Sequence, residues 1–204
     1  MITTRWWHIR HAPVTSRRGW CYGQEDHPAD CSDEETFAAV ARRLPPDAVW
    51  VCSHLRRTRE TAQAIGRAGY RLPDLIEIPD LAEQSFGEWQ GTQHDELKSR
   101  PDSVYTRFWL APARHRPPGG ESFVEVIDRV GRAIDRLNRE HAGRDIVAVT
   151  HGGVIRAAVG IAIGCDPESM LAFQVENVSL TRLDHIPEPE PAWRVNWVNQ
   201  PAKS

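Results

Sequence analysis

Cationic and titratable side chains follow several short apolar segments of this chain, far apart in the sequence. Arg10 and His11 end the first such segment, and Arg57, Glu83 and His151 lie just beyond three later ones. A guanidinium has forked N–H donors that match phosphate oxygens, and an imidazole can form a covalent intermediate. A carboxyl group can protonate a leaving group. If these side chains converge, they fit group transfer from an anionic substrate.

Two glycines follow His151 and precede a helical pattern. Gly152 and Gly153 leave room for an anion to approach the backbone N–H groups and the positive dipole end of that helix. This region therefore predicts an anion-binding turn.

Strand and helix patterns alternate along the chain, which predicts an α/β fold with a mostly parallel sheet and helices on both faces. Two late segments alternate like half-buried strands and predict an antiparallel edge. Because parallel sheets bind ligands at the carboxyl ends of their strands, we expect the side chains above to meet there. The predicted strands are 5–10, 48–53, 75–79, 146–150, 178–183 and 193–198, and the predicted helices are 32–44, 55–69, 122–141 and 152–164.

Two of the predicted helices carry capping-box spacing at their starts. Ser32 with Glu35, and Ser122 with Glu125, place a hydroxyl and a carboxylate three residues apart. We expect both helices to begin there.

The composition is that of an ordinary globular protein. The chain has 204 residues, 40% of them hydrophobic, which suits a single domain over 1–204. Its net charge of −3 disfavours nucleic acid as a partner. No segment approaches ~20 apolar residues, so we expect no membrane span. Four cysteines without CxxC spacing predict reduced thiols and a cytoplasmic location, and Cys21 and Cys31 do not indicate a metal site.

Five ordered motifs resemble those of the histidine phosphatase superfamily, the phosphoglycerate-mutase-like proteins. The resemblance covers roughly residues 5 to 185 and implies a three-layer α/β/α sandwich. The motifs are "RHAP", "SHLRRTRETA", "LAEQSFGEWQG", "PPGGES" and "VTHGGVIR".

The resemblance also implies roles for individual residues. His11 corresponds to the phosphorylated nucleophile and Glu83 to the proton donor. Arg10, Arg57 and His151 correspond to the groups that bind the phosphoryl group, with His151 also part of the catalytic set. No metal and no organic cofactor are implied.

The segment 14–23 departs from the family pattern. Ala12 and Pro13 stand where a glycine and an acidic residue are usual, and Arg17 stands where an asparagine often contacts phosphate. Arg17, Tyr22 and Gly23 are candidate substrate-binding residues. Two further tryptophans, 20 and 109, lie in segments that could border the site.

Structural roles are the alternative for each of these residues. His11 could be a buried structural histidine, Arg57 could lie on a solvated helix face beside Arg56 and Arg59, and His151 could cap a turn. Glu88 and Glu121 compete with Glu83 as the proton donor, and Arg156 is more simply structural.

The function predicted from these residues is hydrolysis of a small phosphorylated metabolite through a phosphohistidine. Alpha-ribazole phosphate and sugar phosphates are candidates, since short bacterial members of the family include alpha-ribazole phosphatase. A phosphoglycerate-mutase type of transfer is the nearest alternative, disfavoured by Gly153 and by the short segment 92–118 as a cover. A non-catalytic phosphate-binding module is the alternative from another class. The oligomeric state stays open.

Overall fold

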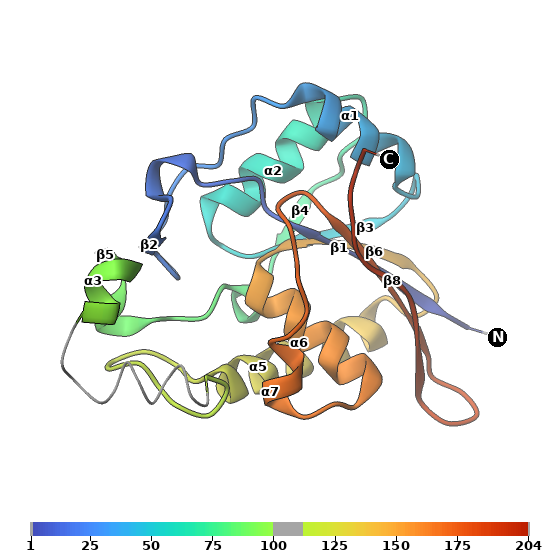
Figure 1. Cartoon of the computed structure of the whole chain (residues 1–204). Coiled ribbons are helices and arrows are strands. Elements are labelled where there is room, and N and C mark those ends of the chain that lie inside the picture. Colours follow the sequence, from blue (N-terminus) through green and yellow to red (C-terminus); the bar gives the residue numbers. More distant parts are fainter. Residues whose placement is uncertain (1, 100–111, 204) are drawn as a thin grey trace.

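A six-stranded sheet forms the centre of the protein, in a computed structural model that describes residues 2–99 and 112–203 (Figure 1). Its strand order is β4-β3-β6-β1-β7-β8. The first four are parallel, and β7 and β8 run antiparallel as an edge hairpin. The bounds are β1 Thr4–Arg10, β3 Val49–Cys52, β4 Leu75–Glu77, β6 Asp145–Thr150, β7 Leu180–Ile186 and β8 Ala192–Gln200.

Helices cover both faces of this sheet. Figure 1 shows α1 (Glu34–Arg43) and α2 (Arg56–Arg67) on one side, and α5 (Phe123–Glu140) and α6 (Gly152–Ile163) on the other. The three-layer arrangement predicted from the alternating pattern is confirmed.

Alternation along β1 explains how one strand contributes to both layers. Trp7 and Ile9 pack in the core beneath α1 and α2, whereas Trp6 packs in the core beneath α5 and α6. Successive side chains of a strand point to opposite faces, so an apolar run with both faces buried is expected of a central strand.

Only one of the two predicted capping boxes forms. Ser122 and Glu125 make the reciprocal bonds at the start of α5. The expectation for Ser32 is wrong, because Asp33 is the N-cap of α1 and its carboxylate accepts from the backbone N–H of Thr36. An aspartate is as good a cap as serine, and Ser32 donates to Asp30 instead.

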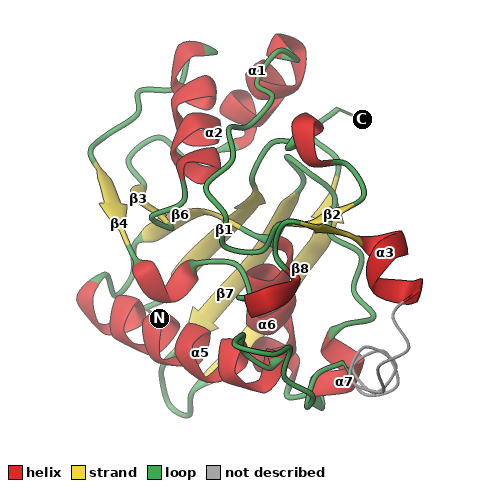
Figure 2. Ribbon diagram, turned by 90° about the vertical axis from the view of Figure 1, so that its left-hand side faces the viewer, coloured by secondary structure: helices red, strands yellow, loops and turns green. Residues whose placement is uncertain are grey.

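Several short elements were not predicted. They include a two-stranded ladder and the short helix that follows it, at the right of Figure 2. Such elements carry too few residues for a periodic pattern. They are β2 Trp20–Cys21, β5 Thr92–Gln93, α3 His94–Ser99, α7 Pro167–Met170 and the 3-10 turns Thr15–Arg17, Pro79–Leu81 and Gly87–Trp89.

Among the described helices, none combines the length and the apolar character that a bilayer crossing requires.

Candidate active site

The two histidines predicted to act together do meet at the carboxyl edge of the sheet. His11 follows β1, and its backbone N–H donates to the Thr150 carbonyl of β6 at 2.9 Å. His151 is the N-cap of α6. Their ring centroids lie 5.1 Å apart with the planes inclined at 58°.

The His11 ring is held in one tautomer. Its Nδ1 lies 2.7 Å from the Ala12 carbonyl oxygen, which can only accept, so Nδ1 carries the hydrogen and Nε2 keeps a lone pair. The residue is 1% exposed. Burial, together with the nearby Arg57 cation, holds the pKa of His11 well below its usual value. A neutral imidazole with a free Nε2 is the nucleophilic form.

Three side-chain hydrogen bonds fix the backbone around His11. The Ala12 N–H donates to Thr61 Oγ1 at 2.8 Å, and that hydroxyl donates to the Arg57 carbonyl at 2.7 Å. Asn177 Nδ2 donates to the His11 carbonyl at 2.7 Å. Thr61 lies inside one of the quoted motifs, which was its available signal, whereas nothing in the sequence singled out Asn177.

Arg10 and Arg57 have guanidinium N–H donors that no described residue occupies. Arg10 donates from one terminal nitrogen to the Val175 carbonyl at 2.6 Å. Arg57 is fully buried and donates to the carbonyls of Glu25 at 2.8 Å and Gly23 at 2.6 Å. Within the described part of the chain, the buried Nε of each guanidinium has no hydrogen-bond partner. Carbonyl contacts orient both groups without neutralising them, which suits an anion site.

His151 also keeps one ring nitrogen unpartnered. Its Nε2 lies 2.8 Å from Ser53 Oγ, and its buried Nδ1 has no partner among the described residues. Burial and the Arg57 and His11 groups lower the pKa of His151 well below its usual value. The ring is therefore neutral at pH 7 and available to contact an oxyanion.

Glu83 lies against the start of α6. Its Oε1 accepts from the Gly153 N–H at 3.2 Å and from the Gln84 N–H at 3.0 Å. A Cβ at residue 153 would lie 2.5 Å from that same oxygen. A glycine at 153 is thus a condition for this position of the carboxyl group.

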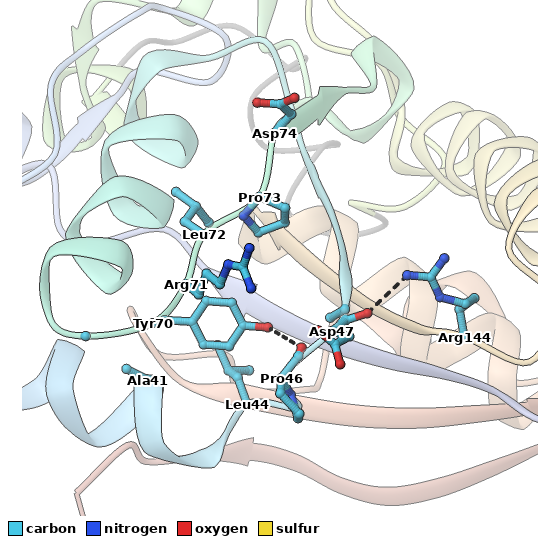
Figure 3. Close-up of a pocket in the computed structure, with 12 residues that line it drawn as sticks. Ala41, Leu44, Pro46, Asp47, Tyr70, Arg71, Leu72, Pro73, Asp74 and Arg144 are labelled. Atoms are coloured by element: carbon cyan, nitrogen blue, oxygen red, sulfur yellow. Dashed lines mark hydrogen bonds between the residues drawn. The ribbon is translucent and has the colours of Figure 1, made fainter.

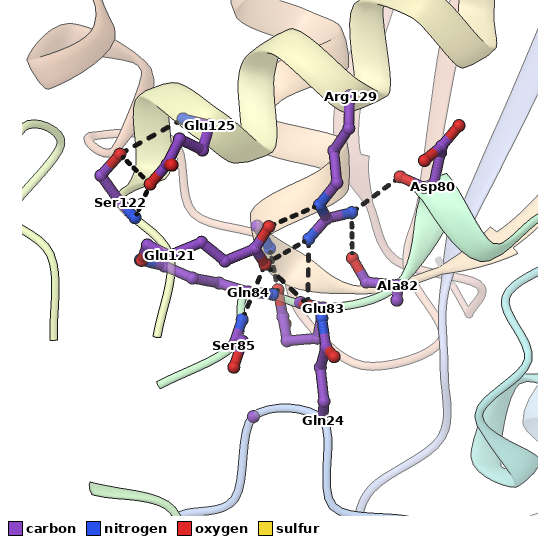
Figure 4. Close-up of polar contacts among 12 residues, drawn as sticks. Gln24, Asp80, Ala82, Glu83, Gln84, Ser85, Glu121, Ser122, Glu125 and Arg129 are labelled. Atoms are coloured by element: carbon purple, nitrogen blue, oxygen red, sulfur yellow. Dashed lines mark hydrogen bonds and ion pairs between the residues drawn. The ribbon is translucent and has the colours of Figure 1, made fainter. Parts of the chain in front are cut away.

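The other two candidate acids are placed differently. Both oxygens of Glu121 accept from the Arg129 guanidinium, each at 2.9 Å, in a largely buried ion pair (Figure 4). Glu88 is exposed, in the 3-10 turn Gly87–Trp89. Of the three acids, Glu83 is the one held beside the α6 N-terminus.

Arg129 ties the Glu83 segment to α5. Its remaining N–H groups donate to the carbonyls of Asp80 and Ala82, both at 2.7 Å, and of Glu83 at 3.1 Å. Glu121 in turn accepts from the Ser85 N–H at 2.8 Å. Figure 4 shows the resulting network, which sets the path of residues 80–85.

The three candidate substrate-binding residues differ in their surroundings. Arg17 is half-buried and its guanidinium lies 5.0 Å from the centre of the Trp20 ring. The Tyr22 ring lies 5.3 Å from the Arg57 guanidinium. Gly23 has φ +41°, and a Cβ there would lie 2.4 Å from Gln90 Oε1, so its glycine is required by packing. Substrate contact by all three stays a prediction, and residue 109 lies outside the described residues.

The remaining arginines have structural partners. Arg56 and Arg59 pair with Glu60 and Glu77 on exposed faces. Arg156 donates from Nε to the Phe173 carbonyl at 2.8 Å. These contacts agree with the structural roles expected for all three.

A hollow of about 890 Å³ lies at the amino ends of the parallel strands, away from the two histidines (Figure 3). Its lining includes Ala48, Asp74 and Arg144, which immediately precede β3, β4 and β6. None of the predicted site residues lines this hollow, so the volume of a hollow does not locate the histidines and arginines.

Comparisons with known proteins agree with this geometry. The family model of the histidine phosphatase superfamily (branch 1) matches residues 6–200. A metal-independent phosphoserine phosphatase of Arabidopsis thaliana is 33% identical over 155 residues, which are 73% of this chain and 64% of that protein. An adenosylcobalamin/alpha-ribazole phosphatase of Escherichia coli is 32% identical over 66% of this chain and 65% of its own length.

A solved structure extends the likeness over nearly the whole chain. The mycobacterial glucosyl-3-phosphoglycerate phosphatase superposes with a TM-score of 0.82 at 25% identity, covering 97% of this chain and 99% of its own. By contrast, the chain spans less than two thirds of the length of the two curated relatives above. The converged histidines and arginines, the sheet that positions them and the match over residues 6–200 lead to one assignment: the chain belongs to the histidine phosphatase superfamily, branch 1.

Proposed function

We propose that the protein hydrolyses small phosphomonoesters in two steps through a phosphohistidine on His11. The observation that carries this is the buried His11 ring, whose Nε2 keeps its lone pair beside unpartnered donors of Arg10, Arg57 and His151. Relatives named for phosphoserine, alpha-ribazole and glucosyl-3-phosphoglycerate support a phosphorylated small molecule as the substrate.

In the first step, the Nε2 lone pair attacks phosphorus and the bond from phosphorus to the alcohol oxygen breaks. Glu83 supplies the proton that the departing oxygen needs. Arg10, Arg57, His151 Nδ1 and the α6 N-terminus stabilise the charge on the three equatorial oxygens.

In the second step, Glu83 takes a proton from a water molecule as the water oxygen attacks phosphorus. The N–P bond breaks, inorganic phosphate leaves and His11 returns to its neutral state. The same carboxyl group is acid and then base, so proton and charge balance over the cycle.

Hydrolysis is favoured over mutase transfer. Gly153 lets Glu83 approach the α6 N-terminus, where it can activate water. The segment 92–118, weighed as a cover for a mutase, includes residues 100–111 outside the described part.

Rapid quenching with a ³²P-labelled phosphomonoester tests the proposal. We expect an acid-labile, base-stable label on wild type and none on His11→Ala, with hydrolysis of p-nitrophenyl phosphate reduced at least ~10²-fold. His141→Ala, at the end of α5, serves as the matched control and should behave as wild type. Equal hydrolysis by His11→Ala and wild type would rule the proposal out.

A further inference from the structure

The Gln90 side chain joins two backbone segments that lie far apart in the sequence. Its Oε1 accepts from the backbone N–H of Gln24 at 3.0 Å and from that of Phe86 at 3.1 Å. Because both neighbours are N–H donors, the amide atom between them must be the oxygen. One half-buried side-chain acceptor therefore bridges the two segments.

The first of these segments orients Arg57. The Gly23 carbonyl accepts from Arg57 Nη2 at 2.6 Å, and the Glu25 carbonyl accepts from Nη1 at 2.8 Å. Gly23 has φ +41°, and a Cβ there would lie 2.4 Å from Gln90 Oε1. The Gln90 amide is thus packed directly against the residue whose carbonyl holds the buried guanidinium.

The second segment carries Glu83, which precedes Phe86 by three residues. The 3-10 turn Gly87–Trp89 ends at Gln90 and returns its side chain to this segment. Gln24 adds a second connection, because its Nε2 donates to the Glu83 carbonyl at 2.8 Å (Figure 4). A shift of either segment relative to the other would therefore break a hydrogen bond to Gln90.

We infer that Gln90 is a positioning residue that keeps the Arg57 guanidinium and the Glu83 carboxyl group in register. The inference rests on the proposed function, since it needs Arg57 to bind the phosphoryl group and Glu83 to protonate the departing oxygen. Both groups must lie at fixed positions around one phosphorus atom, and a misplacement of about 1 Å can cost ~10²-fold in rate. A shared acceptor makes these two positions depend on each other.

Gln90→Met tests this, because methionine has nearly the length of glutamine and accepts hydrogen bonds only weakly. Two quantities that do not depend on the fraction of folded enzyme are measured. The first is the ratio of kcat/KM for phenyl phosphate to that for p-nitrophenyl phosphate, which falls when protonation fails, because phenolate is the poorer leaving group. The second is the Ki of inorganic phosphate as a competitive inhibitor, which rises when Arg57 is displaced.

We expect Gln90→Met to lower the ratio and to raise the Ki, each by at least about threefold. In a Glu83→Gln background, where the acid is already lost, Gln90→Met should lower the ratio no further. Gln90→Glu keeps an acceptor oxygen at the same position and should leave both quantities within about twofold of wild type. Gln93→Met is the matched control, because Gln93 is an exposed glutamine on β5, and it should behave as wild type.

The outcomes separate this inference from the proposed function. If Glu83→Gln lowers the ratio but either quantity is unchanged in Gln90→Met, the inference alone is wrong. It is also wrong if Gln90→Glu is as impaired as Gln90→Met. If Glu83→Gln leaves the ratio as in wild type, or if wild type hydrolyses neither ester, the proposed function fails and the inference falls with it.

Discussion

At the scale of single residues, the Glu83 carboxyl group occupies the space that a side chain at residue 153 of α6 would need. Glu83 Oε1 touches the N–H of Gly153, and the volume that a side chain at 153 would need is filled by that oxygen. Under the proposed mechanism, a side chain at residue 153 would displace the acid, and the effect on the rate should depend on how much protonation the leaving group needs.

Gly153→Ala should lower kcat for alkyl phosphates by about tenfold or more, because the new Cβ at 2.5 Å must displace the Glu83 carboxyl group. p-Nitrophenyl phosphate should be affected less, since p-nitrophenolate leaves readily without a proton. Steady-state kinetics on both esters, with Glu83→Gln beside it, measures the difference. Gly131→Ala is the control, because its Cβ would meet only Ile161, at an ordinary 3.7 Å. An equal loss on both esters would contradict this reading.

At the scale of elements, one arginine of α5 makes several hydrogen bonds to the segment that carries Glu83. Arg129 of α5 connects three carbonyls of residues 80–83 and the Glu121 carboxylate. The two side chains of the ion pair are only 11% and 19% exposed, so removing one partner leaves the other buried and unpaired.

Arg129→Met should lower the free energy of unfolding by about 3–5 kcal/mol, as expected for a broken buried pair. Urea titration followed by circular dichroism measures this loss. Arg116→Met is the matched control, because Arg116 pairs with Glu125 on the same helix with side chains 59% and 40% exposed. The free energy of unfolding of Arg116→Met should fall by less than about 1 kcal/mol. Similar decreases for the two variants would contradict a special contribution of the buried Arg129–Glu121 pair.

Much of this site could be predicted because its residues lie in ordered motifs after strands. His11, Arg57, Glu83 and His151 fall at the ends of apolar segments whose convergence follows from parallel pairing. Arg129 could not be found this way, since a charged side chain on an amphipathic helix usually faces solvent. The backbone carbonyls to which Arg129 donates lie 46 to 49 residues away in the sequence.

At the scale of the whole molecule, the sheet contains a buried histidine, His8, whose ring makes no hydrogen bond to a described residue. His8 of β1 is 1% exposed and stacks on Trp6 with ring centres 5.3 Å apart. Both of its ring nitrogens are buried without a partner among the described residues. Burial lowers the pKa of His8 from 6.5 to about 4. The sequence places His8 within the predicted strand 5–10, but it does not show that the imidazole is buried without a partner.

The stability of the fold should therefore fall in mild acid. Between pH 6.5 and pH 4 the unfolded chain carries a proton on His8 and the folded chain does not, so lowering the pH favours unfolding. This residue alone accounts for about 3 kcal/mol over that interval. His8→Phe should retain that much more stability at pH 4 relative to pH 7 than wild type does, measured by urea unfolding at both values. Parallel pH profiles would show that His8 is not responsible.

The way Arg57 is held limits how the segment 14–23 can be exchanged. Gly23 supplies a carbonyl to the buried guanidinium and Tyr22 lies against it, whereas Arg17 sits on a 3-10 turn whose loss would disturb no strand of the main sheet. A loop exchanged with that of another superfamily member should therefore end before Tyr22. If Arg17 contacts the substrate as the sequence predicts, a graft confined to residues 14–19 should alter which ester is preferred. A graft that included Gly23 would also replace the residue whose carbonyl orients Arg57.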